Sequence, residues 1–317
     1  MESRHIALVG FYGRGNFGDD CYAVLLALAL GQAGHSVSVF RLSEAYSKPF
    51  GLATTSTSEE LLDGADLLLW GGGGLLVRWP DLLYRAMFPG VAGEFHKLVA
   101  RAMQKGIPLA ACSVGGDGSC PRRLTPAYKE HFARSAAFMT VRNPQDLPTL
   151  ERFGVRGAAF PDLMWRAGER LTLPDSVPGG MRIGFDIYPS TVLRRFAPSL
   201  LPALKEVANR RPDCRFFFID STNAGSRPYR GLGRFIRGSN VASYQFSDLE
   251  NDLRFLASLD LLVSSRLHTP MLALQFGVPV ISLLAERKTS LLFSNLGLHC
   301  LSFGRDRVSE LRCLLSS

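Results

Sequence analysis

Residues 6–41 read IALVGFYGRGNFGDDCYAVLLALALGQAGHSVSVFR, in which two short apolar runs flank a glycine-rich turn and a longer apolar stretch. The runs Ile6–Tyr12 and Ser36–Arg41 have the length of buried strands. Asp20–Gly31, between them, has the apolar spacing of a helix. A strand, a helix and a second strand in this order predict a βαβ unit with parallel strands.

The same alternation continues to the end of the chain. In the first half it predicts strands at Leu67–Trp70, Pro108–Val114 and Phe138–Val141, and a helix at Phe95–Lys105. In the second half it predicts strands at Arg182–Ile187, Arg215–Asp220, Val241–Gln245, Leu261–Ser265 and Val278–Leu284, with helices at Leu200–Arg210, Leu249–Leu259 and Pro270–Phe276. Because the composition shifts to proline and glycine between Ala167 and Arg182, we expect a domain boundary there. The predicted fold is α/β, with two Rossmann-like domains, residues 1–170 and 181–317, that face a cleft.

The composition is that of a folded globular protein. Hydrophobic residues make up 46% and charged residues 20% of the 317, which excludes a disordered chain. The six cysteines form no CxxC pair, so we expect neither a metal site nor a disulfide framework. No signal peptide is recognisable, and the apolar stretches are shorter than the ~20 residues of a membrane span. These features predict a cytoplasmic protein.

The net charge of +8 comes mostly from arginine. Such a balance suits nucleic acid, an anionic membrane or an acidic substrate, and it also occurs in proteins of an arginine-rich proteome. Because no RRM, helix-turn-helix or KH pattern accompanies the charge, we expect no nucleic-acid partner. The arginine-rich stretch 227–237 could make peripheral contact with the inner face of a membrane or with a pyrophosphate-linked lipid.

Gly13, Gly15 and Gly18 fit the G-x-G-x-x-G pattern of a dinucleotide-binding loop. Asp19 and Asp20 at the start of the following helix argue against that interpretation, since two carboxylates would repel a pyrophosphate. Two interpretations stay open: a glycine turn with acidic capping, or a loop that presents Asn16 and Asp19 or Asp20 to a polyhydroxyl ligand.

Gly71–Gly74 follows a buried strand. The backbone at Gly72 and Gly73 could form an anion-binding nest, or the four glycines could simply make a tight turn. Residues 113–117, SVGGD, form a third glycine turn at a strand end.

The strongest chemical signal is Ser264–His268, which closes an apolar strand. Arg266 offers a guanidinium for phosphate or carboxylate, and His268 offers a group that exchanges protons near neutral pH. Arg142 and Lys288 also follow predicted strands, so the cations fit a small polyanion. Because we expect these cations at the surface, their truncation should leave the fold intact.

Several stretches, in this order, resemble the polysaccharide pyruvyltransferases. They are GNFGDD (15–20), Gly71–Gly74, Val141-Arg142, Pro161–Leu163, Ser265–His268, Leu272–Pro279 and Lys288. Two departures from the family pattern are Asn143–Asp146, where no serine follows the arginine, and Thr269 in place of a small residue. The resemblance implies a GT-B-like fold and transfer of pyruvate from phosphoenolpyruvate to a sugar as a ketal. It also implies that Arg142, His268 and Lys288 bind the donor or act on it.

On this basis His268 is the expected acid or base, and Asp19 or Asp20 is expected to orient or deprotonate the acceptor. Arg142, Arg266 and Lys288 would hold phosphoenolpyruvate, and the scheme requires no cofactor and no metal. The expected acceptor is a sugar on a lipid carrier or a polymer intermediate. Two alternatives are a glycosyltransferase that uses a nucleotide sugar, with Glu286 on the ribose, and an anion-binding protein without catalysis.

Overall fold

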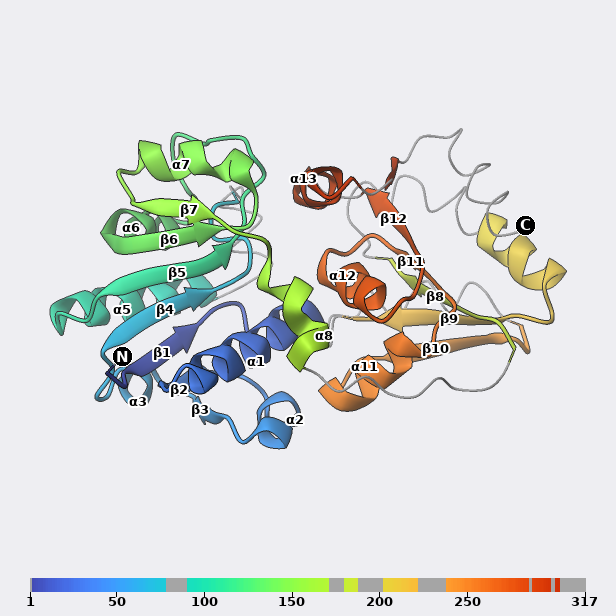
Figure 1. Ribbon diagram of the computed structural model, residues 1–317, viewed down its shortest axis with the longest axis horizontal. Helices are drawn as coiled ribbons and strands as arrows, with labels where there is room; N and C mark the ends of the chain where they lie inside the picture. The colour runs from blue at the N-terminus through green and yellow to red at the C-terminus, as the bar shows by residue number, and fades with distance from the viewer. Residues whose placement is uncertain are drawn as a thin grey trace. The chain divides into compact units, whose positions relative to one another are not determined.

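A computed structural model describes residues 2–77, 90–170, 180–187, 202–221, 238–284, 287–297 and 300–302 (Figure 1). The chain divides into two compact units. Unit 1 comprises Met1–Gly13 and Asp19–Leu163, and unit 2 comprises Arg14–Gly18 and Met164–Ser317. A short segment from the first twenty residues therefore packs with the second half of the chain.

Unit 1 is built on a seven-stranded parallel sheet with the order β3-β2-β1-β4-β5-β6-β7. Its strands are β1 (His5–Val9), β2 (Ser36–Phe40), β3 (Ala53–Thr55), β4 (Leu67–Gly71), β5 (Leu109–Val114), β6 (Ala136–Val141) and β7 (Gly157–Ala159). Its helices are α2 (Glu44–Ser47), α3 (Ser58–Leu61), α5 (Val91–Gln104), α6 (Ala127–Ser135) and α7 (Leu147–Arg152), with 3-10 turns at Lys48–Phe50 and Pro144–Asp146. Helix α1 (Phe17–Gln32) begins in the segment that belongs to unit 2 and continues in unit 1.

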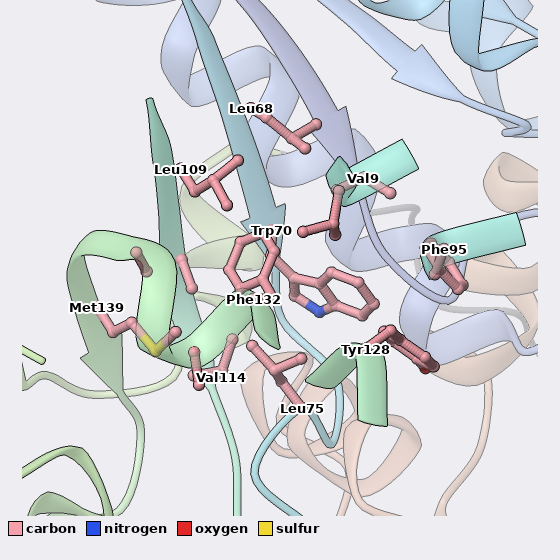
Figure 2. Close-up of a cluster of buried hydrophobic side chains, with 14 of the residues drawn as sticks. Val9, Leu68, Trp70, Leu75, Phe95, Leu109, Val114, Tyr128, Phe132 and Met139 are labelled. Atoms are coloured by element: carbon pink, nitrogen blue, oxygen red, sulfur yellow. The ribbon is translucent and has the colours of Figure 1, made fainter. Parts of the chain in front are cut away.

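The core of unit 1 is centred on Trp70 of β4 (Figure 2). Phe95 of α5 and Phe132 of α6 lie against the indole, with ring centroids 4.9 and 5.6 Å away. Each ring of this size buries roughly 150–250 Å², so this cluster dominates the local hydrophobic stabilisation. The indole Nε1 also donates a hydrogen bond to Gly72 O at 3.2 Å. The same side chain therefore packs the core and fixes the turn after β4.

Unit 2 repeats the arrangement with six parallel strands in the order β10-β9-β8-β11-β12-β13. The strands are β8 (Arg182–Asp186), β9 (Arg215–Asp220), β10 (Val241–Gln245), β11 (Leu261–Ser264), β12 (Val280–Leu284) and β13 (Cys300–Ser302). The helices are α8 (Ala167–Arg170), residues 202–210, α11 (Leu249–Ala257), α12 (His268–Gln275) and α13 (Arg287–Asn295), after a 3-10 turn at Leu163–Arg166.

In each sheet the order in which successive strands are added reverses its sense at one point. In unit 1 the order changes sense between β1 and β4, and in unit 2 between β8 and β11. Open α/β sheets bind ligands outside the carboxyl ends of the strands at such a switch point. We therefore expect ligand-binding residues in the loops that follow β1, β4, β8 and β11.

The predicted α/β class with parallel, Rossmann-like sheets is confirmed. The sequence pattern did not predict β3, β7 and β13, which are three-residue strands at sheet edges. The sequence pattern also predicted that this helix begins at Pro270, whereas α12 begins at His268. His268 therefore lies in the first turn of a helix. None of the helices among the described residues is both long and apolar enough to span a bilayer.

Candidate functional site

The turn after β1 is closed by the protein's own groups. Gly13 has a φ of +64°, and a Cβ there would overlap the carbonyl oxygen of Arg41, so only glycine fits. Its N–H donates to Asp20 Oδ1 at 2.6 Å. The first glycine amide of the G-x-G-x-x-G pattern is therefore occupied by a carboxylate, and this geometry favours an acid-capped turn over a pyrophosphate site.

Asp20 is buried in this turn. Burial raises the pKa of its carboxyl to about 7, with the Gly13 hydrogen bond acting in the opposite direction and the charge of Asp19 adding to the rise. A neutral acid is favoured inside the folded chain, because the charged form loses its hydration there.

The raised pKa of Asp20 predicts a stability that falls with pH. In the unfolded chain the carboxyl ionises near pH 4, while in the folded chain it keeps its proton until about pH 7. The contribution of Asp20 to the free energy of unfolding should therefore be largest below pH 4 and should fall by about 4 kcal/mol by pH 8. Asp20→Asn should remove that part of the dependence in urea titrations at pH 5 and 8. A dependence identical to that of the parent would contradict the assignment.

The glycines after β4 need their small size. Gly72 and Gly73 have φ of +64° and +69°, and a Cβ on Gly72 would lie 2.8 Å from the Tyr22 ring. The carbonyl of Gly73 accepts from Gly115 N at 2.9 Å, and that of Gly74 accepts from the buried Lys129 Nζ at 2.9 Å.

These carbonyl contacts orient the amides of the turn. Across a trans peptide bond the N–H points opposite to the carbonyl, so the amides of Gly74 and Leu75 point away from the groups that hold the carbonyls. A Cβ on Gly73 would lie 3.9 Å from Asp19 Oδ1, which places the half-buried Asp19 beside this turn. The anion nest stays a prediction.

Arg142 differs from the expectation of a surface cation. Its side chain is 2% exposed, and Nη1 lies 3.1 Å from Oδ2 of Asp162, whose side chain is 0% exposed. A Cβ on Gly115 would overlap the guanidinium, so this glycine leaves room for it. The expectation of a surface cation was therefore wrong for Arg142, and because this arginine neutralises a buried carboxylate we expect its truncation to destabilise the fold.

Asp146 organises the neighbouring loop. Its two carboxylate oxygens accept from Gly116 N at 2.8 Å and Gly118 N at 3.0 Å. Burial raises the pKa of this carboxyl, while these hydrogen bonds and Arg142 act in the opposite direction. The stretch Asn143–Asp146, where the family pattern differs, thus anchors the glycine turn that follows β5. From the sequence, Asp162 is only part of a stretch that resembles the family and Asp146 only part of a departure from it, and neither acid has a predicted role of its own.

In unit 2 the predicted residues Arg266 and His268 lie where β11 ends and α12 begins. Arg266 is half-buried, and its backbone N–H donates to Ser264 Oγ at 3.0 Å. Its guanidinium Nη2 donates to Asn16 Oδ1 at 2.7 Å. A Cβ on Gly18 would overlap the buried imidazole of His268. Gly18 is therefore required for close approach to a histidine, which is a different use from the one its pattern suggested.

Asp186, at the end of β8, lies across the switch point of the same sheet. Its Oδ1 accepts from Ser221 Oγ at 2.8 Å, and its carbonyl accepts from Ser264 Oγ at 3.1 Å. Burial raises the pKa of the Asp186 carboxyl, and the positive charge of Arg266 is the main opposing influence. Asp186 was not among the predicted site residues. Its position at a strand end next to the switch point is the signal that could have revealed it.

Three predicted sites involve residues or side chains that lie outside the described part of the chain. Lys288 lies on α13, but its side chain is outside the described residues. Glu286 and the stretch 227–237 also lie outside them. Among the residues that are described, no three His, Cys, Asp or Glu side chains are grouped closely enough to hold a metal ion.

Comparisons with known proteins give a family and a fold. A family model for polysaccharide pyruvyl transferase matches residues 16–285. No curated protein sequence matches the chain significantly.

Among solved structures, a UDP-GlcNAc 2-epimerase from Neisseria meningitidis bound to UDP-GlcNAc aligns with a TM-score of 0.64 and 11% identity over 99% of this chain and 91% of that one. S. aureus MnaA with UDP aligns with a TM-score of 0.69 and 11% identity over 99% and 88%. Anabaena HepE with UDP-glucose gives 0.62 and 12% over 98% and 88%. At these identities the likeness establishes a shared GT-B-type fold of Rossmann-like domains and no more.

Proposed function

The chain belongs to the polysaccharide pyruvyl transferase family, and from that membership we propose that it transfers pyruvate from phosphoenolpyruvate to two hydroxyl groups of a sugar as a ketal, with release of phosphate. The observation that carries the proposal is the arrangement after β11. There a guanidinium and an imidazole, two residues apart, lie at the switch point of a sheet and at the start of α12.

The donor carries a phosphate and a carboxylate, so it needs fixed positive charge. Arg266 supplies a guanidinium, and the first turn of α12 adds backbone N–H groups and the positive end of its dipole. We assign Lys288 to the same donor site on the strength of the family resemblance. The family pattern also assigns Arg142 to the donor, but its pairing with Asp162 already neutralises much of the charge it could offer.

The reaction moves two protons. One is added to the vinyl CH₂ of the donor, which becomes the methyl group of the ketal. The first sugar hydroxyl then attacks the enol carbon, the C–O bond to phosphate breaks, and the second hydroxyl closes the ring. The two hydroxyl protons balance the proton gained by the methyl group and the one that leaves with phosphate. We assign the acid–base steps at the donor carbon to His268.

The acceptor side of the reaction requires a group that accepts a hydroxyl proton. Asp20 already accepts from Gly13 N, whereas the half-buried Asp19 lies beside Gly73. We therefore favour Asp19 as the group that orients or deprotonates the acceptor, with the amides after Gly73 as donors to the same sugar. The acceptor class we propose is a lipid-linked or polymeric glycan precursor at the cytoplasmic face of a membrane.

Removing a donor-site cation should weaken donor binding. We expect Arg266→Ala and Lys288→Ala each to reduce the binding free energy of phosphoenolpyruvate by roughly 1–3 kcal/mol, the range for a hydrogen bond to a charged group. Titration calorimetry measures the change. Arg254→Ala is the matched control, since Arg254 is exposed on α11 and pairs only with Glu250 among the contacts described. Parent-like affinity in both variants would show that the donor site is misplaced.

A thermal-shift screen tests the proposed function as a whole. We expect phosphoenolpyruvate to raise the melting temperature, because a ligand that binds only the folded state stabilises it. Stabilisation by nucleotide sugars without any by phosphoenolpyruvate would favour a glycosyltransferase. Stabilisation by phosphoenolpyruvate without turnover on glycan acceptors would favour an anion-binding protein.

A further inference from the structure

Five residues that follow β1, Arg14–Gly18, pack as part of unit 2. Phe17 anchors them. Its backbone N–H donates to Ser221 O at 3.0 Å, and its buried ring meets Phe246 edge to face with centroids 4.4 Å apart. A hydrogen bond and a buried aromatic pair fix both the backbone and the side chain of this residue, so its two neighbours have defined positions.

The anchor holds Asn16 and Gly18 against the two residues that we assign to the donor. Asn16 Oδ1 accepts from Arg266 Nη2 at 2.7 Å, and Gly18 lies directly against the His268 imidazole. An amide oxygen is a suitable acceptor here because it fixes the direction of a guanidinium without cancelling its charge. A carboxylate in the same place would reduce the attraction for an anionic donor.

The Ser264 hydroxyl also accepts a hydrogen bond from the backbone N–H of Arg266, which fixes the main chain of this residue. Arginine has many rotamers, and a long side chain must be ordered before it can bind a phosphate or carboxylate with both of its N–H edges. The Asn16 contact on the side chain and the Ser264 contact on the backbone remove part of that cost before the ligand arrives.

We propose that Asn16 is a positioning residue for Arg266, and that Phe17 holds Asn16 in place for this purpose. This assignment rests on the proposed function and replaces the expectation that Asn16 itself binds a polyhydroxyl ligand. Residues 16–18 of the GNFGDD stretch then support the donor site, while Asp20 of the same stretch closes the turn after β1.

The test compares Asn16→Ala with the parent, alone and combined with Arg266→Ala. We expect Asn16→Ala to raise the Kd of phosphoenolpyruvate about tenfold while the KM of the acceptor stays within about twofold. In the Arg266→Ala background the same change should alter the donor Kd by no more than about twofold, because residues in contact are not additive. Asn251→Ala, the same truncation on the exposed face of α11, is the control.

Asn16→Asp supplies a second, electrostatic readout. It keeps an acceptor for Arg266 but adds a negative charge, so its effect on donor affinity relative to the parent should shrink as salt rises. The effect of Asn16→Ala should be insensitive to salt. A raised KM for the acceptor with an unchanged donor Kd, or full additivity with Arg266→Ala, would overturn the assignment.

Labelling of Arg266 with phenylglyoxal, followed by mass spectrometry, needs no substrate. Asn16→Ala should speed this labelling several-fold relative to the parent, because the guanidinium loses its restraint. If Asn16→Ala speeds the labelling but the parent does not bind phosphoenolpyruvate, the positioning role stands and the proposed function is rejected. Unchanged labelling would reject the positioning role even if the parent transfers pyruvate.

Discussion

Replacing His268 by glutamine is expected to lower turnover on a glycan acceptor by roughly 10²–10⁴, the usual contribution of one positioned acid–base group. Glutamine can still form hydrogen bonds but cannot carry a proton near neutral pH. The Kd for phosphoenolpyruvate should stay within about tenfold of the parent, since Arg266 and the backbone N–H groups at the start of α12 are unchanged. Steady-state turnover and calorimetry on the same preparations separate the two effects.

His96→Gln is the matched control for this variant, because His96 is exposed on α5. It should leave both turnover and donor affinity at the parental values. If His268→Gln turned over at a rate close to that of the parent, His268 would have no part in the chemistry and would remain a packing residue.

Arg142→Ala should destabilise unit 1 by about 3–5 kcal/mol, since it leaves the Asp162 carboxylate buried and without its counter-charge. Urea denaturation of the variant and the parent measures the difference in the free energy of unfolding. This effect would exceed that of truncating most surface arginines, for which changes within about 0.5 kcal/mol are usual.

The double variant Arg142→Met, Asp162→Leu distinguishes a charge effect from a packing effect. Because it removes both charges and keeps comparable volume, it should recover most of the lost stability. Equal destabilisation in the single and double variants would show that packing of the arginine stem, rather than the ion pair, is what matters.

Local sequence patterns were sufficient for most of the fold. The apolar runs that became β1, β4, β8 and β11, and the glycine turns after β1 and β4, are signals within ten residues of chain. The same patterns placed Arg266 and His268 after a strand, which is where the structure has them. The sequence pattern predicted a domain boundary between residues 167 and 182. In the structure, unit 2 begins at Met164 and also includes Arg14–Gly18.

Local sequence patterns could not predict side-chain contacts between residues that are distant in the chain. Asn16 and Arg266 are 250 positions apart, and no local period connects them. Arg142 looks like any strand-end cation until Asp162, twenty residues on, is seen beside it. Burial and pairing decide whether a charge binds a ligand or holds a fold, and both depend on tertiary contacts.

The chain passes between the two units three times, at 13/14, 18/19 and 163/164. The second half is therefore not a self-sufficient module, although its sheet is complete in itself. A fragment of residues 164–317 would lack the ring that covers Phe246 and the amide that meets Arg266. Exchanging the second half for that of a related protein would succeed only if five residues near the other end of the chain were exchanged with it.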